Sequence, residues 1–323
     1  MAKPLVLGSV LLGLAGTVAA APKGSLFVSS EKDDAVYVLD GATLSQLAKI
    51  ETSERPRALV LDRGKGLLYA ACGEGDAIDV IDVTTDKVVK SLDVGDDPEM
   101  FDLSPDGRRL YASNEDDGLL TVFDLDSESK VAEIEVGEEP EGVMADPNGK
   151  RVYVTSEVAN MVHVVDVTSN ELVANIVVGN RPRRFALTPD GSRLWVTNEI
   201  GGSVSIIDTA GNQVVGEIRF APKGFRAEDV TPVGLVMDKA GKTAYVTLGG
   251  ANHVAVVDVA SAAVEDYILV GRRPWGLALN RAESLLYVTN GKSDDLSVID
   301  VAKRRVQRSA PVGRVPHSVV VYE

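Results

Sequence analysis

The chain has few of the residues that cross-link proteins or bind metals. Its 323 residues include one cysteine, Cys72, and three histidines. One cysteine cannot form an intramolecular disulfide, so packing must stabilise the fold. His163, His253 and His317 are far apart in the sequence and give no zinc pattern, so we predict no metal site. We interpret Cys72 as a small buried or half-buried residue; the alternative is a reactive thiol.

The sequence also lacks the short motifs of common enzyme classes. It contains no Gly-x-Ser-x-Gly, no Cys-x-x-Cys-His haem site, no phosphate-binding glycine loop and no His-Glu-x-x-His. No segment keeps a helical hydrophobic period. We therefore predict no catalytic residue from a motif, and any active site would have to be assembled by the fold.

The chain has fewer basic than acidic residues. The chain has 33 Lys and Arg against 48 Asp and Glu, a formal net charge of −15. An acidic surface repels phosphate backbones and anionic lipid, which argues against nucleic-acid binding. Aromatic residues make up only 5% of the chain and do not form a stacking row between basic residues. We expect most of them to lie in the core.

Long apolar runs are missing except at the N-terminus. Lys3 precedes an apolar stretch over residues 5–18, followed by the small residues Ala19 and Ala20. This pattern is typical of a signal peptide, so we expect residues 1–20 to be removed on export and residues 21–323 to form the mature protein. The alternative is an uncleaved membrane anchor, for which the apolar stretch is short.

What the chain does have is a repeat. An aromatic residue in an apolar strand recurs at intervals of 42 residues, with one interval of 50. The positions are Phe27, Tyr69, Tyr111, Tyr153, Trp195, Tyr245 and Tyr287. Aspartates from Asp40 to Asp300 and prolines from Pro56 to Pro316 repeat with the same intervals, which gives seven copies.

The repeat length predicts the architecture. A unit of about 42 residues with four short apolar runs separated by turn residues is typical of one β-propeller blade. We therefore predict an all-β, seven-bladed propeller with four antiparallel strands in each blade. The first copy lacks its innermost strand, and the chain ends in a spare one after Pro316. This C-terminal strand should join the N-terminal blade and close the ring.

The turns before the innermost strands should surround one mouth of the channel. They carry acidic residues in one sector, namely Asp97, Glu99, Glu139 and Glu141. They carry basic residues in the flanking sectors, namely Arg55, Arg57, Arg181, Arg183, Arg184, Arg272 and Arg273, with Trp275 and His317 beside them. We interpret this as a bipolar mouth that binds a small anionic ligand or a charged partner. The alternative is that neighbouring turns neutralise one another through surface ion pairs.

Three further features of the innermost strands and loops stand out. Arg184 and Asp102 occupy positions that are small or apolar in other copies, so we expect both to face the water-filled channel. Structural ion pairing is the favoured interpretation, and a role in a functional site is the alternative. The 50-residue interval holds an insertion before Pro232 that carries Lys223, Phe225 and Arg226. We expect this loop to project over the mouth. The loops between second and third strands are rich in Asp and Glu but lack EF-hand spacing, so we interpret them as solvated turns.

The repeated RVYVTS, RLWVTN and LLYVTN runs, each followed by a strand such as VSIID, resemble the YVTN family of β-propellers. The ordered turns RPR, DPE, EEPEG, RPRRF, TPVG and VGRRPWG resemble, within it, the periplasmic propellers associated with PQQ-dependent catabolism. The resemblance implies a periplasmic protein of bacteria that oxidise alcohols with pyrroloquinoline quinone enzymes. PQQ enters by this association only, and we assign no cofactor to the chain.

Two functions follow as expectations. The first is a noncatalytic periplasmic binding or assembly module, whose partner would be a PQQ-dependent dehydrogenase or another pathway component. The alternative is a hydrolase such as a lactonase, by analogy with other seven-bladed propellers. An enzyme needs two or three polar side chains that converge deep in the channel. The sequence offers three for that role, Asp102, Arg184 and His317.

Overall fold

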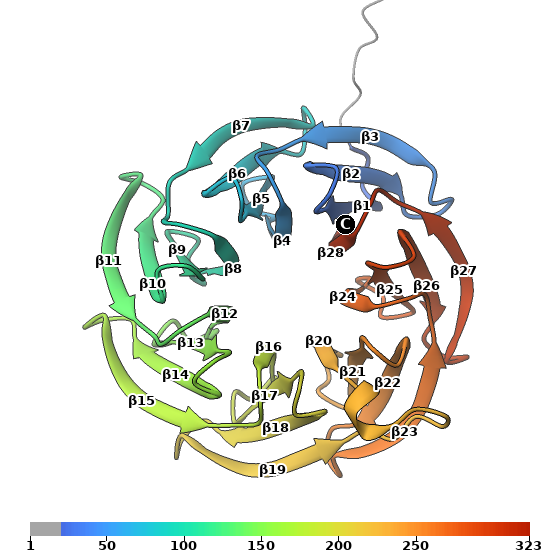
Figure 1. Ribbon diagram of the computed structural model, residues 1–323. Coiled ribbons are helices and arrows are strands. Elements are labelled where there is room, and N and C mark those ends of the chain that lie inside the picture. Colours follow the sequence, from blue (N-terminus) through green and yellow to red (C-terminus); the bar gives the residue numbers. More distant parts are fainter. Residues whose placement is uncertain (1–20) are drawn as a thin grey trace, which may run out of the picture.

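Each repeat forms four antiparallel strands because its apolar runs are short and end in turn residues. The computed structural model describes residues 21–323, so the signal-peptide prediction for residues 1–20 lies outside the described residues. In this part of the chain seven four-stranded sheets stand around one axis (Figure 1). The prediction of an all-β, seven-bladed propeller is confirmed.

The strands occupy four concentric layers around the axis (Figure 1). The innermost strands are β4 (Pro56–Asp62), β8 (Pro98–Leu103), β12 (Pro140–Ala145), β16 (Pro182–Leu187), β20 (Pro232–Met237), β24 (Pro274–Leu279) and β28 (Pro316–Tyr322). The second strands are β1 (Ser25–Ser30), β5 (Leu67–Cys72), β9 (Arg109–Asn114), β13 (Arg151–Ser156), β17 (Arg193–Asn198), β21 (Thr243–Leu248) and β25 (Leu285–Asn290).

The two outer layers are built in the same way. The third strands are β2 (Ala35–Asp40), β6 (Ala77–Asp82), β10 (Leu119–Asp124), β14 (Met161–Asp166), β18 (Ser203–Asp208), β22 (His253–Asp258) and β26 (Asp295–Asp300). The outermost strands are β3 (Gln46–Glu51), β7 (Lys87–Leu92), β11 (Ser129–Glu135), β15 (Glu171–Val177), β19 (Gln213–Arg219), β23 (Ala263–Leu269) and β27 (Arg305–Pro311). A short 3-10 helix, η1 (Ala227–Asp229), lies in the insertion.

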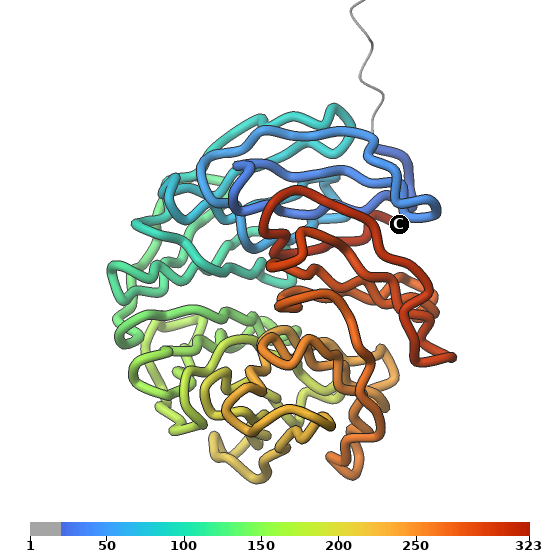
Figure 2. Tube along the Cα trace, turned by 45° about the vertical axis from the view of Figure 1, so that its right-hand side comes forward, coloured from blue at the N-terminus to red at the C-terminus, as the bar shows by residue number. Residues whose placement is uncertain are grey.

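The two ends of the chain share one sheet, as predicted. Strand β28 pairs antiparallel with β1, with Val28 opposite Val319 and Ser25 opposite Tyr322. Figure 2 shows the red C-terminal strand beside the blue N-terminal blade. Ring closure therefore depends on backbone hydrogen bonds between the ends of the described chain.

The repeated aromatic residues lie between blades. Each one is nearly fully buried in its second strand, and Trp195 is only 1% exposed. Tyr69 contacts Phe101 of the next blade, and Tyr153 contacts Phe185 in the same way, with ring centroids 6.4 Å apart in both pairs. These contacts confirm that the aromatic residues form core and join neighbouring blades.

Hydroxyl groups in the second strands also join adjacent blades. Thr289 Oγ1 donates to the carbonyl oxygen of His317 at 2.7 Å, and Ser113 Oγ donates to that of Glu141 at 2.6 Å. Equivalent bonds start from Ser29, Thr155, Thr197 and Thr247. Ala71 occupies this position in the second blade, so the carbonyl of Glu99 receives no such bond. In six of the seven blades, a hydroxyl group of the YVTN-like run thus donates to the backbone carbonyl of the first residue after the next blade's proline.

The turns before the prolines are held by side chains from the preceding blade. The residue before the proline has left-handed φ in six blades, for example 58° at Arg55 and 57° at Arg273. Its amide donates to an Asp or Asn in the loop between second and third strands, as Arg55 N does to Asp34 Oδ1 at 3.0 Å. The same bond forms at Asp97, Arg181, Arg273 and Val315. Part of the acidic character of those loops is therefore structural.

Within residues 21–323, no helix has the length and apolar character needed to cross a membrane. Cys72 is fully buried, and burial raises the pKa of its thiol far above the ordinary value. The interpretation of Cys72 as a small buried residue is confirmed.

Candidate functional site

The first residue after each proline forms a ring around the upper end of the channel, at the face that carries the proline turns. We call this set the charged ring. Its members are Arg57, Glu99, Glu141, Arg183, Val233, Trp275 and His317. All are buried except Trp275, which is half-buried. Glu99 is 0% and Arg183 3% exposed, so their charges must be compensated inside the protein.

A second set of residues surrounds the charged ring. These are the residues that directly follow the second strands, and they are Glu31, Gly73, Glu115, Glu157, Glu199, Gly249 and Gly291. Glutamate occupies this position where an arginine of the mouth lies close enough to pair with it. Glu157 and Glu199, for example, both lie beside Arg183. Glycine leaves space for a large side chain: a Cβ at Gly291 would lie only 2.5 Å from Trp275 Nε1. The residues of the second set are therefore complementary in charge and size to charged-ring residues of adjacent blades.

On one side of the mouth, two arginines bind the acidic residues of the next blade. Arg55 Nη1 lies 3.0 Å from Asp97 Oδ1, and its other terminal nitrogen bonds to Glu99. Arg57 bonds to the same Glu99 and also lies 3.3 Å from Glu31. Glu99 is thus held between two guanidinium groups, which compensate its complete burial.

On the other side, Arg183 is the centre of a larger network. It bonds to Glu157 and lies 3.3 Å from Glu141 and 3.7 Å from Glu199. Arg184 bonds to Glu141, and Arg273 bonds to Glu199. Arg181 lies 2.7 Å from Glu157.

Burial alone would raise the pKa of Glu141, but Arg183, Arg184 and Arg57 lower it far below the ordinary range. The carboxylate stays ionised because three cations surround it.

These contacts correct the prediction of a bipolar mouth. The acidic and basic residues do not form separate sectors, because side chains of adjacent blades reach one another and pair. Nor are the pairs mainly surface pairs, since the central members are buried. Of the predicted mouth residues, Glu139 and Arg272 are exposed and lie outside the network. Trp275 packs under Arg273, whose guanidinium carbon is 4.3 Å from the indole centroid.

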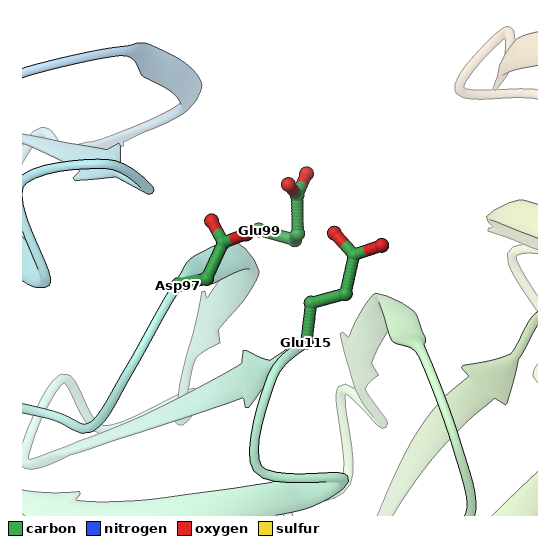
Figure 3. Close-up of side chains that lie close together, drawn as sticks. All are labelled: Asp97, Glu99 and Glu115. Carbon is green, nitrogen blue, oxygen red and sulfur yellow. The ribbon is translucent and has the colours of Figure 1, made fainter.

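Glu115 differs from the other glutamates of the second set. Its carboxylate oxygens lie within 4.8 Å of those of Asp97 and Glu99, which point toward the same space (Figure 3). It is equally close to Glu139 and Glu157. Burial, followed by the charges of Glu141 and Asp97, raises the pKa of Glu115. Such clusters are able to hold a cation, but Arg55 and Arg57 already neutralise Glu99.

The insertion loop does not lie where the sequence predicted. Phe225 packs its ring against His253, with centroids 5.5 Å apart, and His253 in turn contacts Tyr267 of the outermost strand β23. The loop therefore covers the third and fourth strands of the sixth blade, and the prediction that it projects over the mouth is wrong. Burial of the Phe225 ring accounts for this position. Arg226 is exposed and pairs with Asp229 of the same loop; Lys223 is also exposed.

A cavity of about 240 Å³ lies beneath the charged ring, lined by residues further along the innermost strands. Its wall is mostly apolar, with Met100, Met144, Phe185, Leu235 and Leu277. The titratable side chains in the wall are Asp102, Arg184 and His317, from three separate innermost strands. The expectation that Asp102 and Arg184 face the channel is therefore confirmed.

Asp102 is a carboxylate held by backbone amides. Its Oδ1 accepts from Leu103 N at 2.8 Å, and its Oδ2 accepts from Ala145 N of the neighbouring strand at 2.9 Å. Burial raises the pKa of Asp102 to about 6, although both amide bonds act in the opposite direction. Ion pairing is thus the wrong explanation for Asp102, whereas it is correct for Arg184, which pairs with Glu141. A carboxylate with this pKa is suited to proton transfer near neutral pH.

His317 lines the cavity and has one buried ring nitrogen without a hydrogen-bond partner within the described residues. Its Nε2 lies 3.3 Å from Arg57 Nη2. A guanidinium group only donates, so in the neutral imidazole Nε2 accepts this bond and Nδ1 carries the hydrogen. Burial, together with the charge of Arg57, lowers the pKa of His317 well below its usual value and keeps the ring neutral. Nδ1 is buried and has no hydrogen-bond partner within residues 21–323.

Arg184 presents a second free donor. One terminal nitrogen bonds to Glu141, while Nη2 is buried and makes no hydrogen bond within the described residues. An unpaired buried donor is costly, and two in one cavity are unusual. Together with Asp102, they give the cavity two groups that require an acceptor and one group that takes up a proton.

The lower face carries a larger groove of about 650 Å³ between the third and fourth blades. Its arginines are already engaged, because Arg108 pairs with Asp126 and Arg109 donates to Val167 O at 3.2 Å. The cavity beneath the charged ring is therefore the better candidate site.

Sequence reasoning missed Glu31, Glu157 and Glu199 as parts of the network and treated their loops as solvated. All three are near or below one-sixth exposed, with side-chain exposures of 15%, 2% and 8%. A signal was present, since each directly follows a YVTN-like run at the same position of the 42-residue alignment.

Comparison with known proteins supports the propeller fold and gives a partial match to one family model. Residues 173–321, less than half of the chain, match the family model of the seven-bladed β-propeller lactonases. The protein is similar in structure to the periplasmic gluconolactonase of Pseudomonas aeruginosa, with 21% identity, a TM-score of 0.77 and coverage of 93% of this chain and 99% of that one. No curated protein sequence matches the chain significantly.

Two other solved structures show the same fold. Hydrazine synthase of Kuenenia stuttgartiensis has 22% identity, a TM-score of 0.79 and coverage of 91% of this chain and 99% of that chain. A Bacteroides uniformis protein provisionally assigned as a 6-phosphogluconolactonase has 14% identity, a TM-score of 0.76 and coverage of 92% and 98%. At these identities the structures establish the fold and not an activity.

The family match overturns the first functional expectation. A noncatalytic module associated with PQQ-dependent alcohol catabolism is not what the lactonase model indicates. The stated alternative, a propeller lactonase, agrees better with this match.

Proposed function

We propose that this protein is a lactone hydrolase whose reaction takes place in the cavity beneath the charged ring. The observation that carries the proposal is the convergence of Asp102, Arg184 and His317 on that one cavity. The match of residues 173–321 to the lactonase family model supports the same reaction class. No metal is required by this proposal, because the three side chains supply a base and two donors.

The two free donors suit the electrophilic side of the reaction. His317 Nδ1–H donates to the lactone carbonyl oxygen and stabilises the negative charge that develops there. Its position is fixed, because Arg57 holds Nε2 and Thr289 holds the backbone carbonyl. Arg184 Nη2 donates to another acceptor of the substrate and orients it.

Asp102 acts as the general base. Its carboxylate removes a proton from water, and the resulting hydroxide oxygen bonds to the lactone carbonyl carbon. The tetrahedral intermediate then collapses by cleavage of the bond between that carbon and the ring oxygen. The ring oxygen takes up the proton from Asp102 and leaves as a hydroxyl group. The product is a hydroxy acid, and Asp102 returns to its ionised form.

The test is hydrolysis of a panel of γ- and δ-lactones by purified residues 21–323, measured by base consumption at constant pH. We expect the Asp102→Asn variant to lose about 10²- to 10⁴-fold in kcat, the range for removal of a general base. Its unfolding temperature and circular dichroism spectrum serve as the control for folding. Hydrolysis at wild-type rates by Asp102→Asn, or no hydrolysis of any lactone, would contradict the proposal.

We also infer export to the periplasm, on the strength of the N-terminal pattern at residues 1–20. Fractionation of cells that express the full chain tests this inference. Full-length protein of 34.2 kDa in the cytoplasmic fraction would contradict it.

A further inference from the structure

We infer that the substrate is a lactone with a hydrocarbon body and one carboxylate, rather than a sugar lactone. This inference rests on the proposed function, because it assigns the substrate class of the same cavity. Three features of the structure lead to it: the apolar wall, the unpaired nitrogen of Arg184, and the basic groove through which the cavity is reached.

The wall has too few polar groups for a polyol. Most of the side chains around the cavity are hydrocarbon or thioether groups, among them Met100, Met144, Leu235 and Leu277. Besides the three proposed reaction groups, the polar side-chain groups of the wall are the Ser318 hydroxyl and the Trp275 indole N–H. Each sugar hydroxyl buried here without a partner would cost about 1–3 kcal/mol. A hydrocarbon ring and chain gain from the same surroundings.

The volume limits the substrate to a small molecule. Sites for drug-sized ligands begin at about 300 Å³, and this cavity has about 240 Å³. A lactone ring with one short alkyl chain and one carboxylate is of suitable size.

Arg184 is the group that recognises the carboxylate. His317 is neutral and its one free donor is assigned to the reacting carbonyl, so a second anionic group of the substrate must be bound elsewhere. Arg184 Nη2 is the other buried donor without a partner. A bond from a guanidinium group to a carboxylate is charge-assisted and stronger than a bond to a hydroxyl group.

The route into the cavity also favours an anion. At the upper end, six of the seven members of the charged ring are buried, and Trp275 is half-buried. On the lower face, Leu277 lines both the cavity and a groove of about 600 Å³. Exposed Arg63, Lys239 and Arg281 line that groove, against the acidic Glu283 and Glu323. Three cations against two carboxylates give this groove a small excess of positive charge on a chain of net charge −15, which favours the approach of an anion.

The first experiment compares three substrates: a γ-lactone with a short alkyl chain and a carboxylate, the methyl ester of that compound, and gluconolactone. We expect kcat/KM to be at least about tenfold higher for the carboxylate than for the other two, because a hydrogen bond to a charged group contributes about 1.5–3 kcal/mol. Equal or faster hydrolysis of gluconolactone would overturn the inference and leave the proposed function standing.

The second experiment uses Arg184→Met, with Arg219→Met as the matched control. Arg219 lies on the outermost strand β19 with its side chain 71% exposed, far from the channel. Arg184→Met should lower kcat/KM for both substrates, because Arg184 also orients the lactone, and the loss should be at least about tenfold larger for the carboxylate than for the methyl ester. An equal loss for both substrates would show that Arg184 does not recognise the carboxylate.

Binding gives a readout that does not depend on turnover. The ring-opened alkyl hydroxy acid and gluconate are titrated into wild-type protein and Arg184→Met by calorimetry. Preferential binding of the alkyl acid, lost in Arg184→Met, supports the inference even if no lactone is hydrolysed, and in that case the proposed function alone fails. Preference for gluconate, or binding of neither acid, overturns the inference.

Discussion

The upper and lower parts of the central channel use charge in opposite ways. In the charged ring, Arg183 contacts three glutamates, and Glu99 is held by two arginines. In the cavity beneath it, Asp102 has only backbone partners and Arg184 keeps a free donor, as does His317, a member of the ring that also lines the cavity. A buried charge that is fully paired stabilises a particular geometry, whereas one that is incompletely paired is available to a ligand. The paired charges of the ring therefore serve the structure, whereas the incompletely paired groups of the cavity are available for function.

The largest expected effect is on stability, from Arg183→Met. This change leaves Glu141, Glu157 and Glu199 with less compensation in a buried site, so we expect a loss of about 3–5 kcal/mol in the free energy of unfolding. Urea denaturation measures it, with Arg219→Met as the control for loss of an arginine. A loss below about 1 kcal/mol would mean that the ring does not stabilise the fold, and would contradict the distinction between a structural ring and a functional cavity.

His317→Phe tests the opposite side of the comparison. The change removes the free Nδ1 donor and keeps an aromatic ring beside Trp275. We expect kcat for lactone hydrolysis to fall about 10²- to 10³-fold, the usual effect of removing one oxyanion donor. Arg57 keeps Glu99 and Glu31 as partners, so the unfolding temperature should change little. A large loss of stability with normal kcat would assign His317 to the structural ring.

The pH dependence of hydrolysis tests the assignment of Asp102 as the general base. Burial raises the pKa of this carboxyl group to about 6, and the base is active only when ionised. We therefore expect kcat/KM to rise about tenfold per pH unit below 6 and to level off above it. Because the pKa of His317 is far below 6.5, we expect no second step between pH 6 and 8. Rates are corrected for spontaneous hydrolysis, and a flat profile from pH 5 to 8 would contradict the assignment.

The smallest effect concerns the one blade junction that lacks a hydroxyl bond. Ala71 stands where other blades have Ser or Thr, so Glu99 of the charged ring lacks the bond that Glu141 receives from Ser113. Ala71→Ser should restore it and raise the free energy of unfolding by about 1 kcal/mol. Ala112→Ser adds a buried hydroxyl outside this position and is the control. Equal effects of the two changes would show that the bond to the ring carbonyl is not what stabilises the other junctions.

Much of the architecture could be predicted from spacing. The regular positions of Tyr69, Tyr153 and the other aromatic residues gave the number of blades, and the spare strand after Pro316 gave the closure. The site was predicted less well. Arg183 and Glu141 were correctly placed at the mouth but were assigned to separate sectors, and Glu157 was taken for a solvated turn.

The position of the insertion loop in the structure could not be predicted from the sequence either. Its length and position could be read from the 50-residue interval, but the packing of Phe225 on His253 could not. Where a loop settles depends on which apolar surface it meets, and that surface is formed by another blade.

The sequence by itself determined the repeat, the strand order and the side of the ring on which the proline turns lie, because these follow from periodicity and turn residues along one chain. Only the tertiary structure decided which charges are paired and which remain free. Ion pairs and hydrogen bonds depend on separations of a few ångströms between residues of different repeats, such as Arg57 and Glu99, which are 42 positions apart. Those separations are set by how the blades curve around the axis, and no spacing in the sequence records them.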